Sequence, residues 1–249
     1  MGARELRIRP LADLPEIGEG DDLGRLVAEA GDPGGDEIVV LSQKVVSKAE
    51  GRLRRLAEVE PGAPARELAE ELGKDPALVE LILQESRVVL RAERGVLITE
   101  TRQGWVCANA GIDASNLEPG WVSLLPVDAD RSAQMIRRQI ETASGNLPAV
   151  VIADSFGRAW RVGQADIAIG CAGIAPLADG RGRRDARGNE LSATLIATAD
   201  ELAAAADLSR EKDSDAPGAI VFGLTGMTSE EDGPGAAAIR RPASEDLFR

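Results

Sequence analysis

The chain has 249 residues, of which 43% are hydrophobic, and its formal net charge is −13. This length allows one large domain or two small ones around a sizeable core. The acidic balance argues against general nucleic-acid binding, because a phosphate backbone requires a basic surface. The charged start lacks the apolar run of a signal peptide, and no stretch approaches the ~20 apolar residues that span a bilayer. We therefore expect a soluble, cytoplasmic protein that binds neither nucleic acid nor a membrane.

Missing and rare residue types restrict the chemistry further. Histidine is absent, which excludes a Ser-His-Asp triad and histidine-ligated zinc or iron. Cys107 and Cys171 are the only cysteines, so we expect free thiols, although the sequence leaves one bridge between them open. Any metal should be a hard cation held by oxygens, such as Mg²⁺, Mn²⁺ or Ca²⁺.

Apolar periodicity and turn residues predict the following elements. The first half should contain a strand over about 4–9, a helix from Asp21 or Asp22 to Ala30, a strand over 37–42, helices over 64–73 and 75–86, and strands over 87–92, 95–101 and 104–110. The second half should contain a helix over about 130–144, strands over 147–154 and 164–174, a polar loop over 178–190, an Ala-rich helix over about 190–208 and a strand over 217–224. Residues 225–249 should form a loosely ordered tail. The absence of a clean βαβ alternation predicts a mixed α/β fold.

The expected strand over 147–154 ends in Asp154, and Ser155 follows it. A buried strand that delivers a carboxylate to the edge of a sheet places it where α/β folds bind ligands. A neighbouring hydroxyl group can bind the same or a second metal ion near a nucleotide. The alternative is a strand that ends in a turn capped by an aspartate, and these residues alone leave the two interpretations evenly balanced.

The segment ANAGIDASN, residues 108–116, offers short oxygen-bearing side chains, among them Asn109, Asp113, Ser115 and Asn116. Hard cations need such oxygens on an irregular backbone. Structural Asx-turns use the same residues and explain this loop better when it is considered alone. Together with Asp154, the loop favours a divalent-cation site.

Lys48 is a candidate phosphate ligand. In this arginine-rich chain only Lys44, Lys48, Lys74 and Lys212 are lysines, and a lysine offers a compact point charge to a phosphate. A solvated surface residue is the default alternative. No GxxxxGK[ST] or helix-opening GxGxxG sequence is present, so neither a P-loop nor a Rossmann fold is expected.

The chain resembles the coenzyme F420:L-glutamate ligase (F420-0:gamma-glutamyl ligase) family, in the form without a fused reductase domain. The resemblance covers about residues 10–224 and rests on LPEIGEGDDL, LSQKVVSKAEGR, ESRVVLRAERGVLITETRQGWVCANAGIDASN and VVIADSFGRAWRVGQADIAIGCAGIAPLADGRG. It implies a ligase that uses GTP to convert the carboxylate of the coenzyme precursor into an acyl phosphate, which L-glutamate attacks. One glutamate is added, or more through γ linkage. Two sites for Mg²⁺ or Mn²⁺, and a homodimer, are also implied.

The resemblance also assigns residues. It implies that Asp113 and Asp154 hold one metal ion, that Ser155 holds a second, and that Asp154 and Lys48 act in catalysis. The residues implied to bind the nucleotide are Leu14, Pro15, Glu16, Ile17, Ser42, Gln43, Lys48, Asn116 and Lys212. Gln43 stands where Ser or Thr is expected, and the segment from Arg210 to Pro217, expected to close over the nucleotide, departs from the family pattern. GTP as the preferred nucleotide rests on the resemblance alone.

One ligase module over residues 1–249 is expected, with two interlocked subdomains of mixed sheets. Residues 1–75 plus 190–249 would form the nucleotide side, and the β-rich residues 76–189 the metal side. Two other functions remain open from the sequence: a metal-dependent nucleotide or phosphomonoester hydrolase, and a non-catalytic nucleotide- or deazaflavin-binding protein. Phosphate release that requires both glutamate and the deazaflavin would distinguish the ligase from both.

Overall fold

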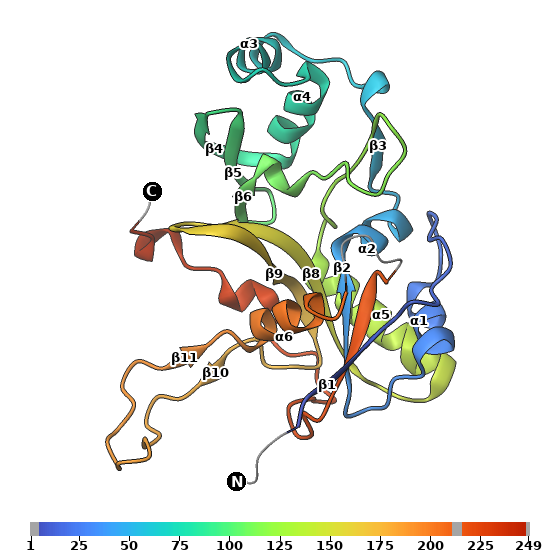
Figure 1. The fold of residues 1–249 in the computed structure, drawn as a ribbon, viewed down its shortest axis with the longest axis vertical. Helices are drawn as coiled ribbons and strands as arrows, with labels where there is room; N and C mark the ends of the chain where they lie inside the picture. Colours follow the sequence, from blue (N-terminus) through green and yellow to red (C-terminus); the bar gives the residue numbers. More distant parts are fainter. Residues whose placement is uncertain (1–4, 211–215, 248–249) are drawn as a thin grey trace.

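A five-stranded sheet forms the centre of the molecule in the computed structural model, which describes residues 5–210 and 216–247 (Figure 1). The strand order is β1 (Arg7–Pro10), β12 (Gly218–Phe222), β2 (Ile38–Ser42), β8 (Ala149–Arg158) and β9 (Arg161–Ala172). β2 and β8 run parallel, whereas every other neighbouring pair in this sheet is antiparallel. The expected mixed α/β fold is thereby confirmed.

Helices cover both faces of this sheet. α1 (Leu23–Gly31) and α5 (Ala129–Ser144) pack on one face, and α6 (Thr198–Asp207) packs on the other. The side chains of β2 alternate accordingly: Val39 and Leu41 join the core beneath α1 and α5, while Ile38 and Val40 join the core beneath α6. Both faces are buried, which explains why this strand is a continuous apolar run.

A smaller lobe stands over one end of the sheet, at the top of Figure 1. It contains α3 (Ala63–Leu72), α4 (Pro76–Glu85) and a three-stranded antiparallel sheet of β4 (Ser86–Glu93), β5 (Val96–Thr101) and β6 (Val106–Ala108). Both helices and β5 share a separate core. Asp75 caps α4 by accepting a hydrogen bond from the backbone N–H of Ala77, at 2.7 Å, as expected of an Asp-Pro start.

Short elements complete the chain. α2 (Gln43–Ala49) follows β2 directly, and β3 (Leu53–Arg55) pairs with β7 (Trp121–Ser123). β10 (Ala178–Asp179) and β11 (Leu195–Ile196) form the base of a long hairpin that protrudes from the body (Figure 1). Single 3-10 turns cover Leu56–Glu58, Asn109–Gly111, Ala236–Ile239 and Ala243–Glu245.

Two expected elements need correction. Residues 190–197, expected to begin a helix, instead return along the hairpin, where Leu195 and Ile196 pair with β10, and α6 begins only at Thr198. Backbone hydrogen bonds such as Gly180 N–H to Thr194 O, at 2.8 Å, hold them there. The strand expected to end at Asp154 continues to Arg158, because its antiparallel partner β9 keeps pairing with it.

The segment after residue 225 was expected to be loosely ordered, yet its part up to Arg240 packs on the body. Arg137, which is fully buried, donates hydrogen bonds to the backbone oxygens of Pro148 and Glu230, both at 2.9 Å, and pairs with Asp232 at 2.8 Å. Asp130 accepts a hydrogen bond from the backbone N–H of Ala236, at 2.6 Å. These partners on α5 supply the order that the composition of the segment does not indicate.

The two sequence stretches expected to form interlocked subdomains both contribute strands to the central sheet. β8 and β9, from the stretch 76–189, lie in one sheet with β1, β2 and β12. The boundary expected at residue 75 falls between α3 and α4, which pack together. In the part of the chain that the structure describes, no helix combines the length and apolar character needed to cross a bilayer.

Candidate functional site

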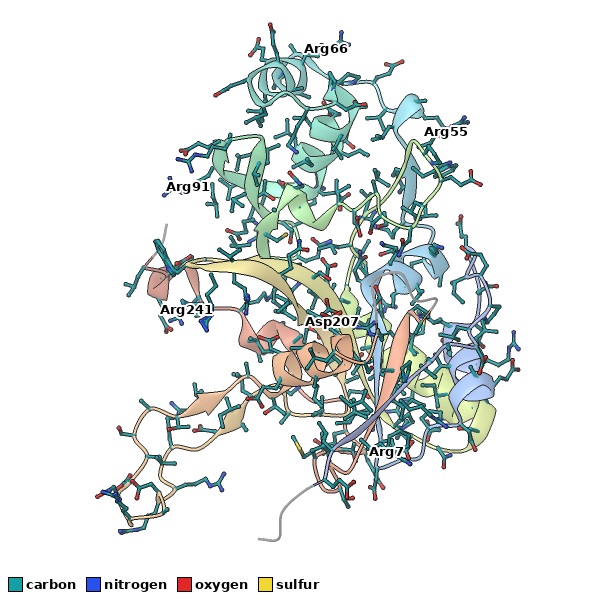
Figure 2. The ribbon with its side chains drawn as sticks, viewed as in Figure 1. Arg7, Arg55, Arg66, Arg91, Asp207 and Arg241 are labelled. Carbon is teal, nitrogen blue, oxygen red and sulfur yellow. The ribbon has the colours of Figure 1, made fainter. Side chains whose placement is uncertain are left out.

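A cleft of about 1030 Å³ lies where β2 ends and α2 begins. Ligand pockets commonly have volumes of about 300–1,000 Å³, so the cleft has room for a nucleotide and a second substrate. In Figure 2 its position is marked by Asp207, at the end of α6, which lies on its wall. Every site residue expected from the sequence lines this cleft, apart from Lys212, which is outside the described residues: Leu14, Pro15, Glu16, Ile17, Ser42, Gln43, Lys48, Asp113, Asn116, Asp154 and Ser155.

Asp154 and Ser155 lie just beyond the point where β8 loses its parallel neighbour. Ser42, the last residue of β2, pairs with Ala153, so the following residues of β8 have β9 alone beside them in the sheet. Successive side chains of a strand point to opposite faces. Asp154 therefore lies on the face that carries Ile152 and α2, whereas Ser155 lies on the α6 face, opposite Asp166 of β9.

The surroundings of Asp154 disfavour its negative charge. The pKa of Asp154 is raised to about 7, mainly by burial and in smaller part by the nearby charges of Asp113 and Asp166. A hydrogen bond from the backbone of Ser155 and the charge of Lys44 act in the opposite direction without cancelling this effect. A carboxyl group in such a place gains stability from a proton or a bound cation.

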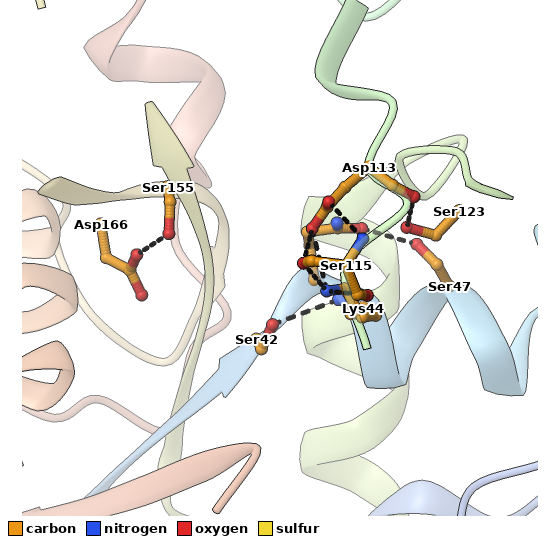
Figure 3. Close-up of polar contacts among 9 residues, drawn as sticks. Ser42, Lys44, Ser47, Asp113, Ser115, Ser123, Ser155 and Asp166 are labelled. Atoms are coloured by element: carbon orange, nitrogen blue, oxygen red, sulfur yellow. Dashed lines mark hydrogen bonds and ion pairs between the residues drawn. The ribbon is translucent and has the colours of Figure 1, made fainter. Parts of the chain in front are cut away.

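Asp113 has the opposite environment (Figure 3). Its carboxylate pairs with Lys44 Nζ at 2.8 Å and accepts hydrogen bonds from Ser115 N–H at 2.8 Å and Ser115 Oγ–H at 2.7 Å. Burial alone would raise the pKa of Asp113, but these hydrogen bonds outweigh it and lower the pKa below its ordinary value. Asp113 is therefore held as a carboxylate, with Lys44 as its counter-ion.

The loop that carries Asp113 leaves the lobe through a left-handed turn. Asn109, Ala110 and Gly111 have φ angles of 52°, 54° and 71°, a conformation that costs residues with a Cβ roughly 1–2 kcal/mol each. At Gly111 a Cβ would also lie 2.7 Å from the side chain of Leu125, so only glycine fits. Strained backbone of this kind clusters at functional sites.

The residues expected to bind the nucleotide line the same cleft. Lys48 pairs with Glu16, and the side chain of Lys48 is largely buried while that of Glu16 is exposed. The side-chain oxygen of Gln43 lies 2.9 Å from Ser47 Oγ inside α2. Gln43 is almost fully buried, so its side-chain oxygen already has a partner within the protein.

The sequence interpretation assigned no role to Lys44 or Asp166, although both line the cleft. Lys44 lies four residues before Lys48 on α2, and residues at this spacing share one face of a helix, so the pair was detectable. Asp166 interrupts an apolar strand, which was a weaker signal. Its buried carboxylate accepts hydrogen bonds from Ser155 Oγ at 2.6 Å and from Arg210 Nη2 at 2.9 Å.

The donors of the cleft fit a divalent cation only together with a ligand. Within residues 5–210 and 216–247, no three His, Cys, Asp or Glu side chains gather as a metal-binding cluster. Asp154 and Ser155 supply oxygens on two faces of β8, and the carboxylate of Asp113 is already paired with Lys44. Since Mg²⁺ is usually held by one or two carboxylates plus substrate phosphates and water, these donors suit a cation that arrives with a nucleotide.

Comparisons with known proteins agree on one family. A family model described as F420-0:Gamma-glutamyl ligase matches residues 12–223. The coenzyme F420:L-glutamate ligase of Methanopyrus kandleri is 44% identical over 250 residues, which cover 100% of this chain and 99% of the relative. The enzyme of the same name from Methanothermobacter thermautotrophicus is 42% identical over 242 residues, and that from Archaeoglobus fulgidus is 39% identical over 247 residues. They cover 95% and 98% of this chain, and 96% of each relative.

These similarities define the class: the protein is an enzyme, an amide-bond-forming ligase. It belongs to the F420-0:gamma-glutamyl ligase family. The resemblance inferred from the sequence is thereby confirmed, and the hydrolase and non-catalytic alternatives give way to the ligase. The roles of single residues stay predictions.

Proposed function

We propose that this enzyme joins L-glutamate to the precursor of coenzyme F420, with GTP as the activating nucleotide and a divalent cation, Mg²⁺ or Mn²⁺, in the cleft. The observation that carries the proposal is that residues expected to bind nucleotide and residues expected to bind metal line one cleft, in a chain 44% identical to a coenzyme F420:L-glutamate ligase. The proposal covers the addition of one glutamate or of more than one.

The proposed reaction has two steps, formation of an acyl phosphate and its attack by an amine. A carboxylate oxygen of the precursor attacks the γ-phosphorus of GTP, which forms an acyl phosphate and releases GDP. The amine of L-glutamate then attacks the acyl carbon, an amide bond forms, phosphate leaves and the amine loses a proton. Phosphoryl transfer depends mainly on positioning and on neutralising charge. A bound divalent cation would supply a positive charge next to the phosphate oxygens.

The protein's own residues have distinct parts in this proposal. Lys48 approaches the phosphates, because its ammonium group lies on the cleft wall beside the segment from Leu14 to Ile17. Its contact with the exposed Glu16 is easily exchanged for a phosphate, since pairs with one solvated partner contribute little stability. Asp154 favours a cation because of its raised pKa. Lys44 keeps Asp113 ionised across the cleft.

The placement of Asp154 and Ser155 supports two cation positions. The two side chains lie on opposite faces of β8, so one small ion in octahedral coordination is poorly placed to bind both. One cation would lie on the α2 face with Asp154 and Asp113, and the other on the α6 face with Ser155.

Mass spectrometry of the coenzyme tests the function directly. The enzyme is incubated with the glutamate-free coenzyme, L-glutamate, GTP and Mn²⁺ or Mg²⁺, and each component is omitted in turn. We expect a product heavier by one or more glutamyl units only in the complete mixture. GTP consumption with an unchanged coenzyme would contradict the proposed acceptor, and turnover that persists in a chelator would contradict the metal requirement.

Two substitutions test the proposed roles. Asp154→Ala should abolish turnover, whereas Asp36→Asn, in an exposed turn before β2, should retain it. Lys48→Ala should weaken the use of GTP more than it weakens Mn²⁺ binding, with Lys74→Ala in the lobe as the matched control. Normal turnover of the Asp154 variant, or an unchanged KM and kcat for GTP in the Lys48 variant, would remove these assignments.

A homodimer is part of the same proposal. Leu195 and Ile196, at the base of the protruding hairpin, expose 50% and 42% of their surface, and contact with a second copy would remove this apolar surface from water. Sedimentation equilibrium decides between monomer and dimer.

A further inference from the structure

The hydroxyl group of Ser155 points its hydrogen in one direction, toward Asp166. Ser155 and Asp166 are directly opposite each other on β8 and β9, so their side chains lie on the same face of the sheet. Ser155 Oγ lies 2.6 Å from Asp166 Oδ1. A carboxylate only accepts, so the hydroxyl must donate its single proton to Asp166.

Asp166 is itself held from the other side (Figure 3 shows the Ser155–Asp166 pair). Its second oxygen, Oδ2, accepts from Arg210 Nη2 at 2.9 Å, and both side chains are 7% exposed. Arg210 is fixed in turn, because it also donates to the backbone oxygens of Ala206 and Pro217, each at 3.3 Å. The carboxylate therefore has one partner on each oxygen and little freedom to turn away.

This arrangement determines what Ser155 can offer to a ligand. Its proton is committed to Asp166, so the oxygen has only lone pairs available for the cleft that it lines. An oxygen in this state can coordinate a cation or accept a hydrogen bond, but it cannot donate one to a phosphate. Outer residues of this kind orient metal ligands and raise their basicity.

We propose that Asp166 is a positioning residue, which holds the Ser155 hydroxyl as a lone-pair donor to the divalent cation on the α6 face of β8. The inference rests on the proposed function, since it requires that cation. Asp166 acts through Ser155 and has no contact with the substrates in this proposal. Arg210 is the residue that keeps Asp166 in place.

The substitution Asp166→Asn tests the polarity with almost no change in shape. Arg210 can only donate, so it will bind the amide oxygen of the new side chain. The amide NH₂ group then faces Ser155 and donates to it. The serine hydroxyl must then turn so that its O–H bond points into the cleft, and this hydrogen repels a cation. Asparagine at position 166 has nearly the same shape as aspartate, but it makes Ser155 present its hydrogen to the cleft in place of a lone pair.

The measurement is Mn²⁺ binding to the full chain in the presence of a non-hydrolysable GTP analogue. Electron paramagnetic resonance reports the free ion, and a sample of Mn²⁺ and the analogue without protein is the reference. We expect two sites in the wild-type enzyme. Asp166→Asn should weaken one site by about 10- to 100-fold, the usual effect of losing an outer-shell partner. Ser155→Ala, which removes the proposed ligand, should weaken the same site at least as much. The double variant should bind within about twofold of Ser155→Ala, because residues that act as one unit are not additive.

Asp200→Asn is the matched control. Asp200 is another partly buried aspartate, and its carboxylate accepts a hydrogen bond from Ala168 of the same strand β9, at 3.0 Å. This variant should bind both Mn²⁺ ions like the wild type. Circular dichroism and thermal unfolding verify that each variant is folded before binding is compared.

Different results would contradict the role of Asp166 and the metal requirement of the proposed function. Wild-type affinity in Asp166→Asn, or an additive loss in the double variant, would overturn the positioning role. If Ser155→Ala binds normally while Asp154→Asn loses a site, Ser155 is no ligand, so the inference fails and the proposed metal dependence stands. If the wild-type enzyme binds no Mn²⁺, both fail together.

Discussion

Asp154 and Ser155 show how much a sequence can predict about single residues. Both were predicted because oxygen-bearing side chains follow an apolar run, and this signal needs only the chain order. Their separation onto two faces was not predictable while the strand was expected to stop at Asp154. The partner of Ser155 was hidden for a similar reason, because Asp166 joins it only through strand pairing and Arg210 only through tertiary packing.

The two cysteines allow a prediction about reactivity. The pKa values of Cys107 and Cys171 are each raised to about 12, mainly by burial and in smaller part by the neighbouring charges of Asp154 and Asp130, respectively. A thiol whose pKa is raised reacts as a thiolate only when the pH approaches that value, so at pH 8 almost none is available. Neither thiol should react with Ellman's reagent in the native enzyme at pH 8.

Both thiols should react within minutes once guanidinium chloride unfolds the chain, which serves as the control. A fast reaction of one thiol in the native enzyme would show that its burial is lost in solution. Cys107 is the more informative of the two, since it lines the cleft.

The elements that the sequence predicted well are those with an uninterrupted pattern. β2, α5 and β12 follow the expected ranges closely, because a buried strand and an amphipathic helix have simple periods. α2 was missed, since its segment is only seven residues long and carries two adjacent valines, a β-favouring residue type. The start of α6 was misplaced because the pairing of Ile196 with Ala178 is a tertiary effect.

The contact between α1 and α5 is close enough to require glycine at position 24. A Cβ added at Gly24 would lie 2.5 Å from the backbone oxygen of Ile136, which cannot turn aside as a side chain can. Gly24→Ala should therefore lower the free energy of unfolding by about 1–3 kcal/mol, the usual cost of overpacking. Urea unfolding monitored by circular dichroism measures it.

Gly35→Ala provides the comparison, because a Cβ at Gly35 would meet nothing within 4 Å. It should change the stability little. An equal effect of the two substitutions would show that the α1–α5 contact is looser than the structure indicates.

Arg137 of α5 is a major partner of the segment 229–240. Arg137→Met should leave the backbone oxygens of Ser229 and Glu230 without a buried partner, at a cost of about 1–3 kcal/mol for each unsatisfied group. We expect this segment to become sensitive to protease and to exchange its amide hydrogens faster. Hydrogen-exchange mass spectrometry resolves this region.

Arg138→Met is the matched control one position further along α5. Arg138 is half exposed and pairs with Glu141 and Asp232 near the surface, and such pairs contribute about 0–1 kcal/mol. Equal exchange in the two variants would contradict the role of Arg137.

At the scale of the whole molecule, the two ends of the chain complete one sheet. β12 lies between β1 and β2, with Ala219, Ile220 and Val221 fully buried. A chain that ends at residue 216 should therefore lack cooperative unfolding and should aggregate. Without β12, β2 would lose one neighbouring strand, and the cores on both faces of the sheet would lose the side chains that β12 contributes. A chain that ends at residue 241 retains β12 and the partners of Arg137 and should fold. Gel filtration and thermal unfolding distinguish the two, and a folded shorter chain would show that β12 is dispensable.

The position of β12 also has a consequence for synthesis. A ribosome makes β1 first, but the partner of β1 in the sheet is β12, which emerges only near the end of translation. Until then the nascent chain carries an unpaired strand. β1 has the sequence RIRP, and its two arginines and its proline discourage pairing with the wrong edge. In the finished sheet Arg7, labelled in the lower part of Figure 2, stacks over the ring of Phe222 of β12, 4.3 Å from its centre. The positive charge of Arg7, which discourages wrong pairing of β1 during synthesis, thus forms a cation–π contact with β12 once that strand has been made.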